Sequence, residues 1–245
     1  IFPQDIFKAY EERKILPKTA ASSPENFKQF FCKHREDGAE IVHFSLSSKI
    51  SANWSNANTA AQEVGGVYVV DSLSLSSGIG LLVMYASDLA ATGKYTAKEI
   101  YEKCMARRAS VQASFMVDTM EYLHKGGRCS GLTRLVATLL RIKPSIYVKE
   151  GAMVVGSKYT GSFSKNILKY VDNTLREFDK PDYTRIFVTH SYADPKDVEA
   201  VKAEIKRLAP QFKEVYETKA SATITAHCGR GTLGILYIND GGTQD

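Results

Sequence analysis

Two consecutive strand–loop–helix units constrain the fold more than any other feature of this chain. The first begins with the β-rich run 41–46 and continues through a polar stretch into an expected helix around residues 60–63. The second begins with an expected strand at 66–71 and leads through residues 72–77 into an expected helix at 78–91. Repetition of this unit predicts a parallel sheet whose functional loops leave the carboxyl ends of its strands.

The second half of the chain carries more strands than crossover helices. Its expected strands are residues 113–117, 142–148, 152–155, 184–189, 212–217, 222–226 and 233–238, and its expected longer helices are residues 163–178 and 195–208. Glu150-Gly151 predicts a tight hairpin turn, and Gly126-Gly127 is expected to end a short helix at 119–124. This order favours a mixed sheet covered by helices over a second doubly wound domain.

We therefore predict an α/β protein of two domains. Residues 1–113 are expected to hold the parallel sheet, and residues 114–245 the mixed sheet. A chain of 245 residues can bury one large or two modest cores. Because no apolar run approaches the length that spans a bilayer, we expect a soluble protein without stable membrane insertion.

Charge and cysteine usage narrow the expected partners and compartment. The 32 lysines and arginines are spread along the chain among 27 acidic residues, which argues against a nucleic-acid-binding face. The four cysteines form no CxxC pair, so reduced thiols in a cytoplasmic protein are expected. Neither clustered carboxylates nor histidines at metal-ligand spacing occur, and we predict no metal and no other cofactor.

Two glycine motifs allow a different interpretation. Residues 229–234 match GxGxxG, but an apolar strand is expected to follow them, whereas a dinucleotide fingerprint opens a helix. Residues 77–80 begin an expected helix, where free N–H groups could attract a phosphate. The alternative function is therefore an enzyme that acts on a small anionic metabolite at the carboxyl ends of the first-domain strands.

Four segments, taken in order, resemble the DegV family of bacterial lipid-binding proteins. They are residues 16–24, 44–60, 118–128 and 226–235, and two shorter matches lie at 71–80 and 140–144. The family's first strand and its acidic-serine turn have no counterpart before Ile1. We therefore expect the first domain to lack its first strand.

The resemblance implies a carrier without a catalytic centre of its own. Such a protein encloses one long-chain fatty acid of the palmitate, stearate or oleate kind. It presents the carboxylate to the ATP-binding subunit of a fatty acid kinase, which forms an acyl phosphate for phospholipid metabolism.

Carried over residue by residue, the resemblance assigns the carboxylate to three side chains, Thr19, Ser51 and His227. Ser22, Asn53 and Arg128 are secondary candidates. Where the family usually has Ser-Gly-Thr, this chain has Ser51-Ala52-Asn53. Each residue taken alone is also typical of a turn, a cap or a structural contact, so the assignment depends on the three together.

These side chains suit a buried fatty acid. Burying about fourteen methylenes gains on the order of 11 kcal/mol, so the tail supplies the affinity. The carboxylate needs donors once it leaves water, and two hydroxyls and an imidazole can donate. Because these donors are neutral or weakly basic, the carboxylate remains a usable nucleophile toward ATP.

Overall fold

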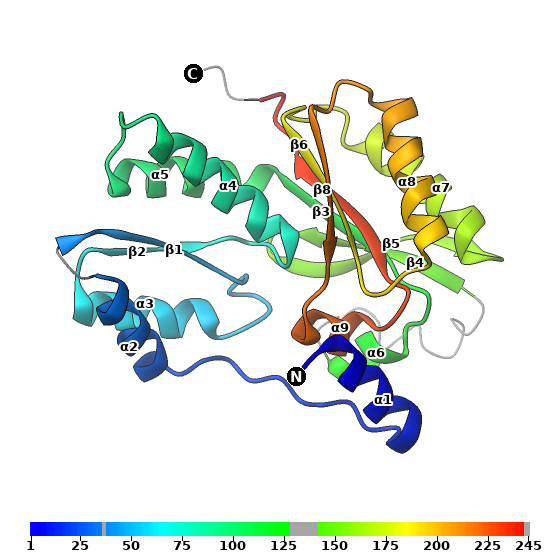
Figure 1. Cartoon of the computed structure of the whole chain (residues 1–245), viewed down its shortest axis with the longest axis horizontal. Helices are drawn as coiled ribbons and strands as arrows, with labels where there is room; N and C mark the ends of the chain where they lie inside the picture. Colours follow the sequence, from blue (N-terminus) through cyan, green and yellow to red (C-terminus); the bar gives the residue numbers. More distant parts are fainter. Residues whose placement is uncertain (36–37, 128–141, 243–245) are drawn as a thin grey trace. The chain divides into compact units, whose positions relative to one another are not determined.

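The computed structural model describes residues 1–35, 38–127 and 142–242, which group into two compact units (Figure 1). Unit 1 comprises Ile1–Thr19, Gln112–Lys149 and Met153–Asp245, and unit 2 comprises Ala20–Val111 and Glu150–Ala152. The domain limits at 1–113 and 114–245 stay a prediction.

Unit 2 contains a small parallel sheet, as the repeated strand–loop–helix unit predicts. Strands β1 (Ile41–Ser45) and β2 (Val67–Asp71) pair in parallel, with Ile41 opposite Val67 and Ser45 opposite Asp71. Both strands therefore end at the same edge of the sheet, and the polar loops that follow them start there.

Helices cover both faces of this sheet, as Figure 1 shows. The helices are α2 (Pro24–His34), α3 (Asn53–Val64), α4 (Ser77–Ala91) and α5 (Ala97–Arg107), followed by the short 3₁₀ helix η2 (Arg108–Ser110). Val69 packs in a core with α2 and α3, and its neighbour Val70 packs in a second core with α4 and α5. Successive residues of a strand point to opposite faces, so one short strand serves both cores.

Unit 1 is built on a six-stranded mixed sheet, which confirms the predicted class. Its strands are β3 (Val111–Met116), β4 (Ile142–Lys149), β5 (Ala152–Thr160), β6 (Arg185–His190), β7 (Glu214–Lys219) and β8 (Leu233–Ile238), in the order β5-β4-β3-β8-β6-β7. The β3–β4 and β6–β8 pairs are antiparallel and the β6–β7 pair is parallel. The predicted hairpin turn between β4 and β5 is present, with positive φ at both Glu150 and Gly151.

Helices α7 (Phe163–Glu177) and α8 (Pro195–Leu208) pack together with the central strands of this sheet. In α7 the buried residues Ile167, Tyr170, Val171 and Thr174 follow the spacing of a single helix face. The hydroxyl of Tyr170 accepts a hydrogen bond from the backbone N–H of Ile235 and pairs with Ser114. The buried phenol is thereby satisfied, as a polar group in a core has to be.

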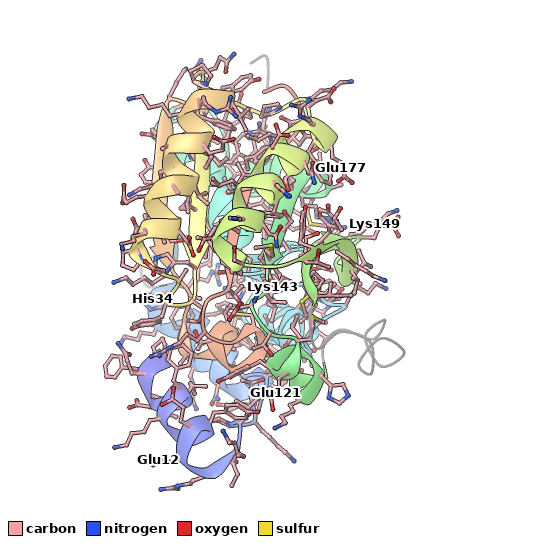
Figure 2. All side chains as sticks on the ribbon, turned by 90° about the vertical axis from the view of Figure 1, so that its right-hand side faces the viewer. Glu12, His34, Glu121, Lys143, Lys149 and Glu177 are labelled. Atoms are coloured by element: carbon pink, nitrogen blue, oxygen red, sulfur yellow. The ribbon has the colours of Figure 1, made fainter. Side chains whose placement is uncertain are left out.

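Three further helices gather at one end of unit 1: α1 (Pro3–Arg13), α6 (Glu121–Gly126) and α9 (Ala222–Cys228) (Figure 1). Figure 2 shows Glu12 of α1 and Glu121 of α6 at this end, and Glu177 of α7 at the opposite end. We refer to α1, α6 and α9 together as the three-helix cap.

The strand predicted at 222–226 is wrong, because these residues form the first part of α9. Thr223, Ile224 and Thr225 are β-branched, which favours a strand. Ser221, however, caps the helix by accepting a hydrogen bond from the N–H of Ile224. His227 therefore lies in the last turn of a helix.

Candidate functional site

Thr19 and His227, which are 208 positions apart in the sequence, are hydrogen-bonded to each other. Thr19 Oγ1 lies 2.8 Å from His227 Nε2. Thr19 belongs to the non-helical connector after α1, and His227 belongs to α9; both side chains are half-buried. The structure thus brings two of the three predicted carboxylate ligands together, with the imidazole and the hydroxyl side by side.

Aromatic contacts hold α1 against the rest of the cap. The ring of Phe7 meets that of Tyr192 edge-on at 5.5 Å, and the ring of Tyr10 packs on that of Tyr122 at 4.8 Å. The guanidinium of Arg230 lies over Phe7, 4.7 Å from the ring centre. These rings therefore anchor α1, the helix from which the connector leads to Thr19.

Hydrogen bonds also fix α9. Ser191, directly after β6, pairs through its hydroxyl with that of Thr225 at 3.0 Å, and its N–H donates to the carbonyl of Thr232. The hydroxyl of Thr232 in turn donates to the carbonyl of Cys228 at 2.7 Å, which satisfies an end carbonyl of α9. Strand β8 begins at Leu233, within the GxGxxG match, and up to residue 242, the last one described, no helix follows the motif, as the sequence predicts. Because Thr232 of this motif bonds to the end of α9, the glycine loop supports that helix.

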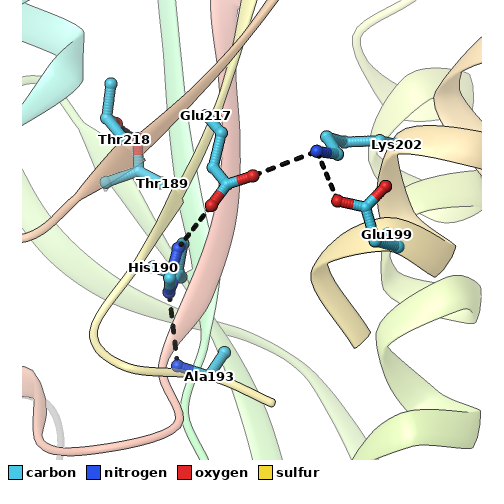
Figure 3. A network of polar contacts seen from close by, with 7 residues as sticks. All are labelled: Thr189, His190, Ala193, Glu199, Lys202, Glu217 and Thr218. Carbon is cyan, nitrogen blue, oxygen red and sulfur yellow. Dashed lines mark hydrogen bonds and ion pairs between the residues drawn. The ribbon is translucent and has the colours of Figure 1, made fainter. Parts of the chain in front are cut away.

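The residue before Ser191 anchors the same loop in a polar network (Figure 3). His190 Nδ1 accepts a hydrogen bond from the N–H of Ala193, so the neutral ring carries its proton on Nε2, which faces Glu217 at 3.4 Å. Glu217 also accepts from Lys202 at 3.0 Å, and this hydrogen bond is the main cause that lowers the pKa of its carboxyl group. His190 is thus a structural histidine.

Ser51 lies in unit 2, in the loop that leaves β1. Its N–H donates to the carbonyl of Ser47 at 3.1 Å, and its hydroxyl oxygen accepts from the N–H of Asn53 at the start of α3. A serine oxygen that accepts a hydrogen bond still has its O–H to donate. The half-buried Ser51 therefore suits an anionic acceptor.

A buried carboxylate, Asp71, organises the loops at the carboxyl ends of β1 and β2. It accepts hydrogen bonds from the N–H of Ser48 at 3.1 Å, from the hydroxyl of Ser48 at 2.6 Å and from the N–H of Leu73 at 3.3 Å. Its backbone carbonyl accepts from Arg108 at 2.8 Å. We call Ser47, Ser48, Asp71 and Leu73 the Asp71 loops.

The sequence analysis did not assign a role to Asp71. Its position at the end of a predicted strand, followed by serines, was the available signal, but this pattern is equally typical of an ordinary loop. Leu73 and Ser76 have positive φ, which is costly for residues with a side chain and persists only where the surroundings enforce it. The Asp71 loops are therefore held in a defined conformation by hydrogen bonds, and they lie at the edge where ligands of open α/β sheets bind.

The secondary candidates Ser22 and Asn53 are also brought together, through backbone contacts of Ser22. The side-chain oxygen of Asn53 accepts from the N–H of Ser22 at 2.9 Å, and the side-chain amide of Asn56 donates to the carbonyl of Ser22 at 2.7 Å. Both asparagines thus hold the connector against α3. Arg128, the third secondary candidate, lies outside the described residues.

The thiol next to His227 is not poised for chemistry. Cys228 is buried, and burial raises the pKa of its thiol to about 12, so the thiolate is scarce at neutral pH. Across residues 1–35, 38–127 and 142–242, no three histidine, cysteine or acidic side chains group as metal ligands. Over the same residues no helix has the length and apolar character needed to cross a membrane.

Comparison with known proteins identifies close parallels over the whole length. A fatty acid-binding protein of Thermotoga maritima is 32% identical over 242 residues, which covers 95% of this chain and 82% of the relative. The solved structure of a DegV family protein from Thermus thermophilus, described as binding fatty acid, is 28% identical, with a TM-score of 0.85 over 98% of this chain and 85% of its own.

A more distant structure shares the fold. The B3 protein of the Streptococcus pneumoniae fatty acid kinase, loaded with linoleic acid, is 21% identical, with a TM-score of 0.84 over 97% of this chain and 84% of its own. The sequence profile of the DegV family matches residues 1–240. This chain belongs to the DegV family.

Proposed function

We propose that this chain binds one long-chain fatty acid and that Thr19, Ser51 and His227 hydrogen-bond its carboxylate. The observation that carries the proposal is the 2.8 Å contact between Thr19 and His227, which pairs a hydroxyl with an imidazole across 208 positions of sequence. The fatty acid-binding relative and the fatty acid-binding structure at 28% identity support the class of ligand.

The donors explain why a carboxylate fits. Ser51 accepts from Asn53 and retains its own O–H, and Thr19 and His227 can each donate once a ligand oxygen replaces their mutual contact. A carboxylate shut away from water needs such donors, because burial without them costs several kcal/mol. None of the three is a lysine or arginine, so the carboxylate keeps most of its nucleophilic character.

This chemistry supports a carrier more than an enzyme. In the proposed reaction a carboxylate oxygen attacks the γ-phosphorus of ATP on a separate ATP-binding kinase subunit, the bond to the β–γ bridging oxygen breaks, and ADP leaves. The kinase supplies the catalytic groups, and this chain supplies the bound acid without a cofactor. The acyl phosphate would then enter phospholipid metabolism.

The proposed compartment is the cytoplasm, because the buried Cys104 and Cys228 are free thiols. Burial raises the pKa of both thiols to about 12, so neither is a reactive thiolate.

The first test is denaturing extraction of the mildly purified protein followed by mass spectrometry of the released molecules. We expect close to one fatty acid per chain, of the palmitate, stearate or oleate kind. A protein free of lipid that carries a small anionic metabolite would instead support the alternative enzyme.

Site variants then test the three residues. We expect Thr19→Ala, Ser51→Ala and His227→Ala to stay folded and to bind oleate at least about tenfold more weakly, the size of one lost hydrogen bond to a charged group. Matched controls are Thr59→Ala, Ser87→Ala and His124→Ala, which alter exposed residues of helices. Wild-type affinity in the three site variants would remove the assignment.

A third experiment tests the kinase step. The loaded protein is mixed with ATP and the ATP-binding subunit of a bacterial fatty acid kinase, and acyl phosphate is trapped with hydroxylamine. We expect hydroxamate only when all three components are present. Binding of fatty acid without any hydroxamate, with an active kinase control, would support a storage role instead.

A further inference from the structure

Helices α6 and α9 contact each other through two reciprocal pairs of a ring and a glycine. A methyl group on Gly126 of α6 would lie 2.5 Å from His227 Nδ1, and one on Gly229, directly after α9, would lie 2.6 Å from Cδ2 of Tyr122 in α6. Both distances are far shorter than a normal van der Waals contact. Each ring therefore occupies the space that a side chain on the facing glycine would need.

The backbone of Gly126 does not itself require glycine. Its φ lies outside the left-handed region, unlike that of the next residue, Gly127, which has φ +65° and caps α6. Glycine inside a helix is less favourable than alanine, because it loses more backbone freedom. The close approach of His227 is therefore the physical reason for a glycine at 126.

We infer that Gly126 is a positioning residue for the carboxylate site: by lacking a side chain, it lets the His227 imidazole stand where Nε2 reaches Thr19. The inference rests on the proposed function. The imidazole is rigid, so any displacement of Nδ1 by a methyl group also displaces Nε2, which lies 2.8 Å from Thr19 Oγ1. A substituent at 126 thus acts on the ligand-binding nitrogen through the opposite edge of the ring.

The surroundings prevent α9 from moving away as a unit. Thr225 is hydrogen-bonded to Ser191, and the carbonyl of Cys228 accepts from Thr232. On the α6 side, Tyr122 is packed between Gly229 and the ring of Tyr10. With α9 held at Thr225 and Cys228 and α6 held at Tyr122, the His227 side chain is the part that has to rotate when Gly126 gains a methyl group.

Gly126→Ala tests the inference, and Gly127→Asn is its matched control. Among the described residues, nothing lies within 4 Å of a Cβ atom placed on Gly127, and asparagine tolerates the left-handed conformation found there. The delipidated proteins are titrated with oleate. We expect Gly126→Ala to bind at least about tenfold more weakly and Gly127→Asn to bind as the wild type does.

A second measurement reports on the ring without any ligand. The chain has five histidines, and their imidazole carbon–proton resonances can be followed by NMR, with His227 assigned from the His227→Ala variant. We expect Gly126→Ala to shift the His227 resonance and leave those of His43 and His190 in place. Gly127→Asn should shift none of these three.

Thermal unfolding of a double-mutant cycle distinguishes a clash between residue 126 and the His227 ring from a nonspecific loss of stability. In the wild-type background Gly126→Ala should lower the melting temperature, whereas in the His227→Ala background it should raise it, because only the helix preference remains. The inference is overturned if Gly126→Ala keeps the His227 resonance and the oleate affinity, or if its effect on stability is the same in both backgrounds. If the wild type itself binds no oleate, the proposed function fails, while the resonances and the cycle still decide whether Gly126 positions His227.

Discussion

The two regions that carry the proposed carboxylate ligands are held by different forces. In unit 2, the N–H of Ser51 donates to the carbonyl of Ser47, which is part of the Asp71 loops. There the Asp71 carboxylate accepts hydrogen bonds from Ser48 and Leu73, and the carbonyl of Ser74 accepts from the N–H of Ser47. In unit 1, the three-helix cap places His227 through ring packing and close approach to Gly126.

This difference has energetic consequences. A hydrogen-bonded loop loses stability in steps as donors and acceptors are removed, because each lost bond costs separately. A close-packed contact is sensitive to volume in both directions, since either a cavity or an added methyl group is unfavourable. The Ser51 region should therefore tolerate changes of size better than the His227 region does.

The largest expected effect comes from truncating Phe7, a buried ring of α1. Phe7→Ala should lower the free energy of unfolding by about 3–5 kcal/mol, because Phe7 is 3% exposed and contacts both Tyr192 and Arg230. Urea unfolding measures the change. Phe2→Ala is the control, since Phe2 is 72% exposed, and its effect should stay within about 0.5 kcal/mol. Equal effects of both variants would show that α1 does not stabilise the cap.

The next effect breaks the Asp71 loops. Asp71→Ala should cost roughly 2–3 kcal/mol, because three donors from Ser48 and Leu73 lose their acceptor, whereas Ser48→Ala should cost about 1 kcal/mol. Urea unfolding again gives the values, with the exposed Ser87→Ala as the neutral reference. An Asp71→Ala protein as stable as the reference would contradict the description of these loops as hydrogen-bonded.

A smaller effect concerns His43, a half-buried histidine of strand β1. His43 packs against the rings of Phe27 and Phe31, and burial lowers the pKa of its imidazole below 6.5. The unfolded chain therefore takes up the proton first, so stability is lost as pH falls below 6.5 toward the folded-state pKa. As pH falls through this window, the wild type should lose stability relative to His43→Phe. A difference that is constant with pH would refute it.

The smallest effect tests a polar contact of the cap between the buried Tyr10 and the exposed Glu121. A hydrogen bond with Tyr10 is the main cause that lowers the pKa of Glu121 below 4.5, with Lys125 as a further partner. Its stabilisation is present above pH 4.5 and disappears as pH falls through the lowered value. Tyr10→Phe should therefore be less stable than wild type at pH 7 and approach it in acid. Glu11→Gln, on the same helix, serves as the control.

The sequence predicts the architecture better than it predicts the contacts. The parallel pair β1 and β2, the hairpin at Glu150-Gly151 and the mixed sheet follow from strand spacing and turn chemistry, and all are confirmed. The strand predicted at 222–226 is wrong. Three β-branched residues favour a strand locally, but the capping hydrogen bond of Ser221 starts a helix there.

The candidate site depended on contacts that no local pattern contains. Gly126-Gly127 indicates the end of a helix, but only the folded chain distinguishes a glycine with left-handed backbone from one that accommodates the ring of His227. The partner of Thr19 lies 208 positions away, and the resemblance to the DegV family, not spacing, pointed to it. The hydrogen bonds of Asp71 likewise require knowing which serine faces the carboxylate.

The place of β8 in the sheet has a consequence for biosynthesis. This strand, residues Leu233–Ile238, lies between β3 and β6, so it joins β5-β4-β3 to β6-β7. A ribosome releases it after the other strands of this sheet, and until then the two groups have open edges that can pair wrongly. The nascent chain therefore cannot complete its large sheet before synthesis has passed residue 238. The hydrogen bonds that Ser191 and Thr232, next to β6 and β8, make to α9 depend on the same sheet.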